Sequence, residues 1–291
     1  MCVLLLAGAI IANLLVANRP GQPVDTWTPP PVDATPPPLP EPTTFKEATD
    51  WLQNNPLYNQ SITTPVNCTE LEPIDALSAT EAELNAHLLN LTSCLLRAWK
   101  APVEAAGFQM PRPRATAFPQ SIKTACGVID KLNAIYCGND QSIYYHSRYP
   151  TRRGPELQRT KFLMEMVLGH EFGHAIQART GILPATWAWE DRAPTNAEAN
   201  VYSRRAELQA DCLSGMWTRS VAQSQGLSDA DIANLGRVVY SMGDDVVLKR
   251  PNVDATHGLG KTRQRWFEVG LNGDMRIAKC NTYSVPADQV R

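Results

Sequence analysis

The sequence has no excess of charge of either sign. Its 291 residues include 27 lysines and arginines and 29 aspartates and glutamates. A protein that binds nucleic acid through its phosphates needs a strongly basic surface, and this balance does not provide one. We therefore expect no nucleic acid among the partners.

The cysteines include no C-x-x-C pair, which argues against a zinc knuckle. Apart from Cys2 in the apolar start of the chain, six cysteines remain. Disulfide bonds formed in an oxidising compartment are the better interpretation, although spacing alone leaves many pairings open. These cysteines are Cys68, Cys94, Cys126, Cys137, Cys212 and Cys280.

No basic residue precedes the apolar run at the start of the chain. Residues 2–17 are almost wholly apolar, which is long for a signal-peptide core and short for a membrane-spanning helix. Residues 28–44 are rich in proline, which favours an extended tether. We expect an anchor or signal over residues 1–18, a Pro-rich linker over 19–44 and an extracytoplasmic domain, either membrane-anchored or secreted.

Neither a second linker nor an internal repeat follows the proline-rich stretch, so we expect one domain over residues 45–288. Capping boxes at Thr44 and Thr80 mark two helix starts. Helices outnumber strands, so the predicted class is α+β, mainly helical. The predicted helices cover residues 45–54, 81–100, 155–180, 196–224, a segment after Ser228 and 260–271, and the clearest strand covers 142–146.

The stretch LGHEFGHAIQ, residues 168–177, contains the pattern H-E-x-x-H. His170 and His174 lie about 40° apart around a helix axis, so both imidazoles can approach one metal ion. Glu171 is adjacent and could accept a proton from a water molecule there. The pattern is typical of zinc peptidases, but it also arises by chance in a helix with polar residues near a solvated end.

A catalytic zinc needs a third protein ligand and an open position for water. Thr180 stands where a metzincin would carry a third histidine, so a carboxylate is the better candidate. Glu190, Glu198 and Glu207 follow in the sequence, and of these Glu207 has an acid four residues later. That acid, Asp211, could accept a hydrogen bond from a ligand histidine and fix its tautomer. We predict one zinc ion per chain, held by the two histidines and Glu207.

Several motifs follow one another in an order that resembles the bacterial neutral zinc metallopeptidase family, and the third ligand resembles that of the wider gluzincin group. The motifs are TACG, YCGNDQSIYY, HEFGH, ELQADCLSGMW, HGLGKTRQRWFEVG and CNTY, over about residues 80–283. The resemblance implies a zincin-like fold, with the H-E-x-x-H helix under a small sheet whose edge strand lines the cleft. It implies His170, His174 and Glu207 as ligands and Glu171 as general base. The stretch YYHSRYPTRR departs from the family by being more basic, which bears on substrate preference.

These features predict a zinc-dependent peptidase in which zinc and Glu171 activate a water molecule. The oxyanion of the transition state would need a further donor, for which His257 and Tyr144 or Tyr145 are candidates. The alternatives are a non-catalytic zinc-binding scaffold of the cell envelope and a hydrolase of non-peptide substrates. Glu171 favours an enzyme, because a structural zinc site does not need it. The expected partners are a peptide or protein substrate and, through the N-terminal segment, a membrane.

Two disulfide bonds are predicted from position in the chain. Cys126 and Cys137 flank ten residues that end just before the predicted strand. Cys212 is rotated by about 100° around the helix axis from Asp211 and so faces away from the predicted metal. We therefore expect it to pair with Cys280. The pair left by elimination is Cys68 and Cys94.

Overall fold

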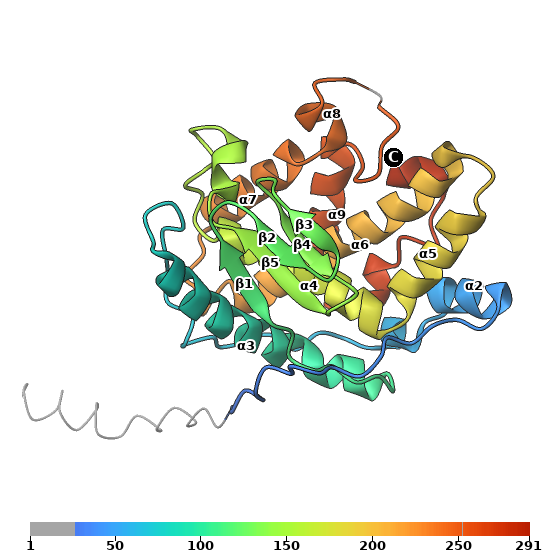
Figure 1. The fold of residues 1–291 in the computed structure, drawn as a ribbon, viewed down its shortest axis with the longest axis horizontal. Coiled ribbons are helices and arrows are strands. Elements are labelled where there is room, and N and C mark those ends of the chain that lie inside the picture. Colours follow the sequence, from blue (N-terminus) through green and yellow to red (C-terminus); the bar gives the residue numbers. More distant parts are fainter. Residues whose placement is uncertain (1–26, 252) are drawn as a thin grey trace, which may run out of the picture.

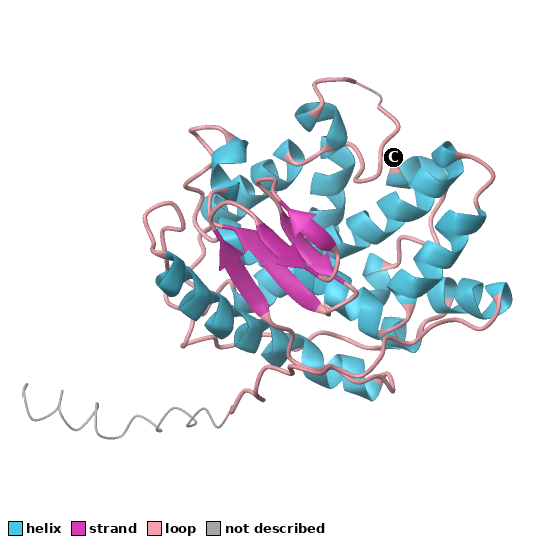
Figure 2. Cartoon of the chain, viewed as in Figure 1, coloured by secondary structure: helices cyan, strands magenta, loops and turns pink. Residues whose placement is uncertain are grey.

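Helices dominate the chain and pack against a small sheet (Figures 1 and 2). The computed structural model describes residues 27–251 and 253–291. It confirms the predicted α+β class. The helices are α2 (Phe45–Gln53), α3 (Glu81–Ala105), α4 (Leu163–Arg179), α5 (Ile182–Arg192), α6 (Asn196–Val221), α7 (Asp229–Ser241), α8 (Asp244–Val247) and α9 (Gly260–Asn272). The strands are β1 (Ala115–Phe118), β2 (Ile122–Thr124), β3 (Gly127–Ile129), β4 (Ala134–Cys137) and β5 (Ser142–His146). Short 3-10 helices are η1 (Pro56–Asn59), η2 (Tyr149–Arg153), η3 (Ile277–Cys280) and η4 (Ala287–Val290).

Side-chain caps begin several helices where the sequence predicts them. The Thr44 hydroxyl accepts a hydrogen bond from the Glu47 N–H at the start of α2. Thr80 and Glu83 form the predicted capping box of α3. Each cap satisfies a backbone N–H group that has no partner within the helix. These starts are predictable because the signal is local.

The predicted start of the helix that carries the two histidines is wrong. α4 begins at Leu163 rather than near Pro155. Phe162 has a φ of 68°, in the left-handed region, and a residue there cannot continue a right-handed helix. The sequence-based prediction does not include α5. Gly181, with a φ of 77°, lies between α4 and α5, and Ile182 begins α5 without an intervening loop that would mark a second helix.

The sheet leaves one strand with a free edge beside α4. The strand order is β1-β5-β4, with β5 parallel to β1 and antiparallel to β4. β4 is therefore an edge strand, and it contacts α4. The hairpin of β2 and β3 forms a separate two-stranded sheet. An edge strand carries backbone N–H and C=O groups without partners in its own sheet, so β4 can bond to something else.

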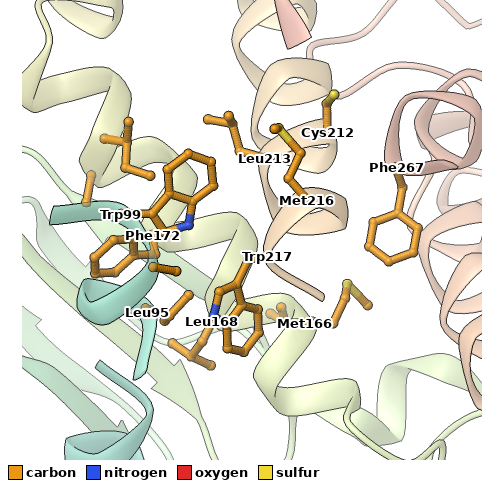
Figure 3. Close-up of a cluster of buried hydrophobic side chains, with 14 of the residues drawn as sticks. Leu95, Trp99, Met166, Leu168, Phe172, Cys212, Leu213, Met216, Trp217 and Phe267 are labelled. Carbon is orange, nitrogen blue, oxygen red and sulfur yellow. The ribbon is translucent and has the colours of Figure 1, made fainter. Parts of the chain in front are cut away.

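α4 runs through the centre of the core. All of its residues except His174 are buried, as in a helix that is enclosed on every side. Figure 3 shows Leu168 and Phe172 of α4 among side chains of α3 and α6. Trp99 of α3 and Trp217 of α6 are at most 1% exposed. The helix with the two histidines is therefore held rigidly by its neighbours.

Glycines allow α6 to approach its two neighbouring helices closely. A Cβ added to Gly173 of α4 would lie 3.1 Å from the Ala210 Cα of α6. A Cβ added to Gly270 of α9 would collide with the carbonyl oxygen of Cys212 on α6. α4, α6 and α9 thus form a tightly packed layer, and this packing sets the distance between groups on the three helices.

The described part of the proline-rich stretch lies against the domain and is hydrogen-bonded to it. Residues 27–44 contain little regular structure, as expected. Arg112 donates a hydrogen bond to the Pro30 carbonyl (3.1 Å). Arg179, the last residue of α4, donates one to the Pro37 carbonyl (2.8 Å). The segment is therefore fixed to the end of the helix that carries the two histidines.

The predicted anchor or signal, residues 1–18, lies outside the described residues. Within residues 27–251 and 253–291, no helix has both the length and the apolar character that crossing a membrane requires.

Three disulfide bonds join the cysteines in the predicted pairs. Their presence is typical of a protein in an oxidising compartment. One of them fastens the end of β4 to the turn between β2 and β3, and another fastens α6 to η3. The pairs are Cys68–Cys94, Cys126–Cys137 and Cys212–Cys280.

Removing single disulfides with paired Cys→Ser changes should lower the free energy of unfolding by an amount that grows with the logarithm of the loop size. The chain-entropy relation gives about 3 kcal/mol for the loop closed by Cys126–Cys137 and about 4 kcal/mol for that closed by Cys212–Cys280. Urea unfolding under non-reducing conditions measures both values. Free thiols at these positions in the protein isolated from its native compartment would contradict the pairing.

Candidate metal centre

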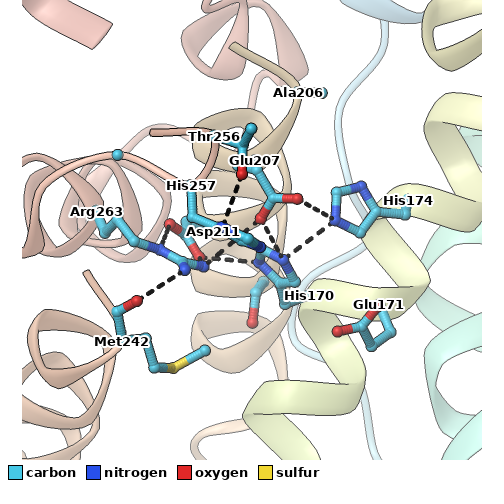
Figure 4. A network of polar contacts seen from close by, with 12 residues as sticks. His170, Glu171, His174, Ala206, Glu207, Asp211, Met242, Thr256, His257 and Arg263 are labelled. Carbon is cyan, nitrogen blue, oxygen red and sulfur yellow. Dashed lines mark hydrogen bonds and ion pairs between the residues drawn. The ribbon is translucent and has the colours of Figure 1, made fainter. Parts of the chain in front are cut away.

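Three side chains from two helices converge at one point (Figure 4). His170 and His174 project from α4, and Glu207 projects from α6. One ligand atom of each lies within 4.8 Å of the others. The Glu207 oxygens lie 3.3 Å from His170 Nε2 and 3.4 Å from His174 Nε2. Two imidazole nitrogens and one carboxylate oxygen make a set that could hold a metal ion.

The other nitrogen of each imidazole faces an acceptor oxygen. His170 Nδ1 lies 2.9 Å from Asp211 Oδ1, and His174 Nδ1 lies 2.8 Å from Gln177 Oε1. With a proton on each Nδ1, the two Nε2 atoms present lone pairs, and they face one another at 3.2 Å. Lone pairs held so close need a positive charge beside them. This is the tautomer that metal-binding histidines adopt.

Asp211 is fixed by an arginine from a third helix. Arg263 of α9 donates from Nε to Oδ2 (2.8 Å) and from Nη2 to Oδ1 (2.9 Å). The side chains of Asp211 and Arg263 are 2% and 3% exposed. Burial would raise the pKa of Asp211, but the charges of Arg263 and His170 outweigh burial and lower it. The carboxylate therefore stays ionised and orients the His170 ring.

Two glutamines position the second histidine. Gln177 donates from Nε2 to the Ala206 carbonyl (2.8 Å) and to Gln209 Oε1 (3.0 Å). Gln209 in turn donates to the Cys280 carbonyl (3.1 Å). Because both hydrogens of the Gln177 amide have acceptors, its oxygen must face His174. This chain of bonds connects the His174 tautomer with the disulfide-linked segment at Cys280.

Negative charge at the cluster stabilises positive charge on His170. Burial alone would raise the pKa of Glu207, but the charges of His257 and His174 and hydrogen bonds with the cluster hold it well below its usual range. Burial lowers the pKa of His170, yet Asp211 and Glu207 raise it to about 10. A metal ion that binds here must displace that proton, and its own positive charge then balances the negative charges of Asp211 and Glu207.

A cleft of about 720 Å³ opens over the cluster. Its lining includes Ala134, Ile135 and Tyr136, so one wall is the edge strand β4. Glu171 also lines the cleft, and its Oε2 accepts a hydrogen bond from the Tyr136 N–H (2.8 Å). Figure 4 shows Glu171 beside the cluster rather than within it. This is a suitable place for a proton acceptor that does not bind the metal.

His257 reaches the cleft from the loop before α9, and its side chain is 50% exposed. Its backbone N–H donates to Asp244 Oδ2 (2.7 Å), and its Nδ1 lies 3.3 Å from Asp244 Oδ1. The charge of Glu207 raises the pKa of His257, with help from the Asp244 hydrogen bond and against burial. The structure thus brings this predicted residue within electrostatic range of the cluster.

Tyr144 does not reach the cleft, which corrects its prediction as a transition-state donor. Its hydroxyl donates to Asp140 Oδ2 (2.8 Å), and its ring packs in a separate cluster with Phe118. The Tyr145 hydroxyl is buried in the core and is not part of the cleft lining. Tyr149 of η2 lines the cleft instead. It lies in a turn after the strand, where no periodic pattern identifies it.

Two further residues of the site, Arg263 and Gln177, are absent from the sequence-based prediction. Both lie in quoted motifs, HGLGKTRQRWFEVG and LGHEFGHAIQ. Helical spacing tells which residues share a face but not which other helix packs against that face. Only the fold shows that α9 brings an arginine to Asp211 and that Gln177 meets α6.

Comparisons with known proteins identify a family. Residues 65–283 match the model of the family described as "Putative neutral zinc metallopeptidase". The chain is 30% identical to "Uncharacterized protein YpfJ" of Escherichia coli (strain K12) over 193 residues, which are 64% of this chain and 66% of that protein. It is 31% identical to "Uncharacterized protein Rv2575" of Mycobacterium tuberculosis (strain ATCC 25618 / H37Rv) over 199 residues, 60% of this chain and 63% of that protein.

These alignments span just under two thirds of the length of the relatives. No solved structure matches the chain significantly. The family match covers most of the chain and includes the helices of the cluster, and it confirms the resemblance that the motifs indicate. The chain belongs to the putative neutral zinc metallopeptidase family.

Proposed function

We propose that the protein is a zinc-dependent peptidase with a zinc ion held by His170, His174 and Glu207. The observation that carries the proposal is the convergence of these three ligand groups within 4.8 Å. Three protein ligands with room for water are typical of a catalytic zinc rather than a structural one. The cleft above the cluster offers that room.

The residues present fit a zinc ion. Both imidazoles present Nε2, because Asp211 and Gln177 occupy the other nitrogens. Glu207 supplies a carboxylate with a low pKa, which is the ionised form that a metal needs. When bound, zinc acidifies a water molecule and polarises the carbonyl of a substrate.

Glu171 acts as the general base in this proposal. Its Oε2 is held by the Tyr136 N–H, so the carboxylate has a fixed orientation at the cleft. It would accept a proton from the attacking water and return it to the leaving nitrogen. This role accounts for the position of the Glu171 carboxylate, which lies beside the metal ligands but is not one of them.

His257 would stabilise the negative charge that develops on the carbonyl oxygen. Asp244 lies beside its ring and orients it, and an N–H group of the imidazole would be the donor. Tyr149 lines the same cleft and is a second donor candidate. His257 is thus kept from the sequence-based prediction, and Tyr149 takes the place of Tyr144 in this part of the proposed mechanism.

The free edge of β4 would bind the peptide backbone. The His146 N–H donates to the Asn133 carbonyl, and Ile135 pairs with Tyr144 across the sheet. Because the direction of backbone groups alternates along a strand, Ala134 and Tyr136 point their N–H and C=O groups away from β5. The hydrogen bond from the Tyr136 N–H to Glu171 agrees with this register. An extended peptide added to this edge would lie across the cluster.

The proposed location is extracytoplasmic, supported by the three disulfides. The apolar N-terminal run would attach the protein to a membrane or direct its export. The proposed substrate is a peptide or a protein in that compartment.

Changing Glu171 to Gln should leave one zinc ion per chain and lower peptide cleavage by about 10²- to 10⁴-fold, the usual contribution of a general base. Glu207→Gln should instead lose the metal, because it removes a ligand. Metal content measured by mass spectrometry, with digestion of a peptide library in the presence and absence of chelator, tests both. Loss of zinc from Glu171→Gln with full retention in Glu207→Gln would refute the ligand assignment.

Asp211→Ala should weaken zinc binding by about 10- to 100-fold, because His170 loses the acceptor that orients it. A competitive chelator titration measures the affinity. Glu268→Ala on the exposed face of α9 serves as the control and should bind zinc normally. An unchanged affinity in Asp211→Ala would mean that the carboxylate does not orient the ligand.

Gln177→Ala should also weaken zinc binding, by about 10-fold, because His174 loses the acceptor for its Nδ1 proton. Gln177→Glu keeps an acceptor oxygen and should bind zinc more tightly than Gln177→Ala. The same titration compares the two variants, and nitrogen chemical shifts of the imidazoles report the His174 tautomer. Equal affinities would show that the Gln177 oxygen has no role.

A further inference from the structure

One wall of the cleft is basic. Lys131, Arg152 and Arg153 all belong to its lining. Arg152 donates from Nη1 to the Leu132 carbonyl (2.8 Å), beside the start of β4. The two arginines belong to the YPTRR turn, the stretch whose basic character departs from the family resemblance. The proposed peptidase mechanism uses none of these three cations.

Arg153 is the deepest of these cations, at 6% exposure. Its Nη1 lies 3.3 Å from the Ser241 hydroxyl, and its Nε is buried without a hydrogen-bond partner. The guanidinium carbon lies 5.3 Å from the centre of the Tyr149 ring. Within the described part of the chain, no carboxylate lies within ion-pair distance of Arg153. Arg112 and Arg179 are equally buried without a carboxylate partner among the described residues, but they donate to backbone carbonyls, whereas Arg153 keeps a buried N–H without an acceptor, which is costly.

The surroundings of Arg153 add to its positive field. Burial lowers its pKa, and the charges of Arg152 and Arg263 lower it further, whereas Tyr149 and Tyr145 act in the opposite direction. Arg263 is neutralised by Asp211. Arg152 makes its described hydrogen bonds to uncharged oxygens. No carboxylate among the described residues therefore balances the positive charge of Arg153.

The acidic groups of the cleft are engaged elsewhere. Glu207 faces the two histidines, and Asp244 bonds to His257. Glu171 accepts the hydrogen bond from the Tyr136 N–H. Among the described residues, the cleft therefore leaves no acidic group to pair with Arg153.

Arg153 also lies near the proposed reaction centre. Burial raises the pKa of Tyr149, the charge of Arg153 lowers it, and the charge of Glu171 raises it. Tyr149 is thus within electrostatic range of both residues, and all three line the same cleft. A group bound at Arg153 would belong to the molecule whose peptide bond lies at Glu171.

We propose that Arg153 is the binding site for a carboxylate group of the peptide substrate, so that the protein prefers acidic peptides. The proposal rests on the proposed peptidase function and specifies its substrate class. The planar guanidinium matches a carboxylate in geometry and charge, and a ligand carboxylate would supply the negative charge that the described residues do not place beside it. Two sources share this chemistry: an aspartate or glutamate side chain and the free C-terminus of the peptide.

Binding of fluorescent peptides to the full-length Glu171→Gln protein separates these sources. One set carries a single glutamate at successive positions of a glutamine- and alanine-based decapeptide with an amidated C-terminus. A second peptide has no glutamate and a free C-terminus, and the parent peptide has neither charge. Fluorescence polarisation measures each dissociation constant, with zinc present, at low and high salt.

The expected result is that glutamate at one position, or the free C-terminus, binds about 10- to 100-fold more tightly than the uncharged parent, as for a hydrogen bond to a charged group. Arg153→Gln should abolish this preference, and Arg153→Lys should retain part of it. Arg237→Gln, an exposed arginine of α7 outside the cleft, is the matched control and should retain it fully.

Equal binding of charged and uncharged peptides would overturn the carboxylate site, even if uncharged peptides are cleaved. This comparison needs no change at Arg153, so it decides the question even if Arg153→Gln does not fold. A preference that persists in folded Arg153→Gln would also overturn it. A preference without any cleavage by the unsubstituted protein would support the carboxylate site while refuting the peptidase.

Discussion

The buried ion pair between Asp211 and Arg263 is the interaction on which the metal centre depends. It joins α6 to α9, and through Asp211 it fixes the His170 ring on α4. Three helices far apart in the sequence thus meet in one set of bonds. Removing one partner of such a pair costs about 3–5 kcal/mol, because the other charge is left buried alone. The same bonds therefore contribute to both the orientation of the ligand and the cohesion of the domain.

Close helix packing makes that set of bonds possible. Gly173 and Gly270 remove the side chains that would separate α6 from α4 and α9. On the opposite side of the cluster, Gln177 and Gln209 link His174 to the segment that a disulfide fastens to α6. Both histidines are thus fixed before any metal binds, so little ordering is required on binding. Preorganisation of this kind favours affinity and correct geometry.

The cleft presents two different surfaces to a ligand. In the proposed function, β4 would offer backbone groups that bind an extended peptide without regard to its side chains. The η2 turn would offer charge that discriminates between side chains. A backbone-binding wall and a charged wall on either side of one reaction centre would combine general peptide binding with a preference for acidic groups. The Pro-rich stretch that lies on the end of α4 adds to the rigidity of the scaffold.

The sequence by itself determines those features that depend on local spacing. The helical spacing of His170 and His174, the matching interval from Glu207 to Asp211 and the helix caps at Thr44 and Thr80 are all readable, because helix geometry relates residues three or four apart. Only Thr80 forms the full capping box, because the Glu47 carboxylate bonds to Thr43 instead of Thr44. The tertiary structure decides which helices meet. It places Arg263 beside Asp211. It also places Tyr149, and not Tyr144, in the lining of the cleft. The left-handed backbone of Phe162 makes α4 begin later than predicted. These outcomes depend on packing between distant segments, and no local pattern encodes them.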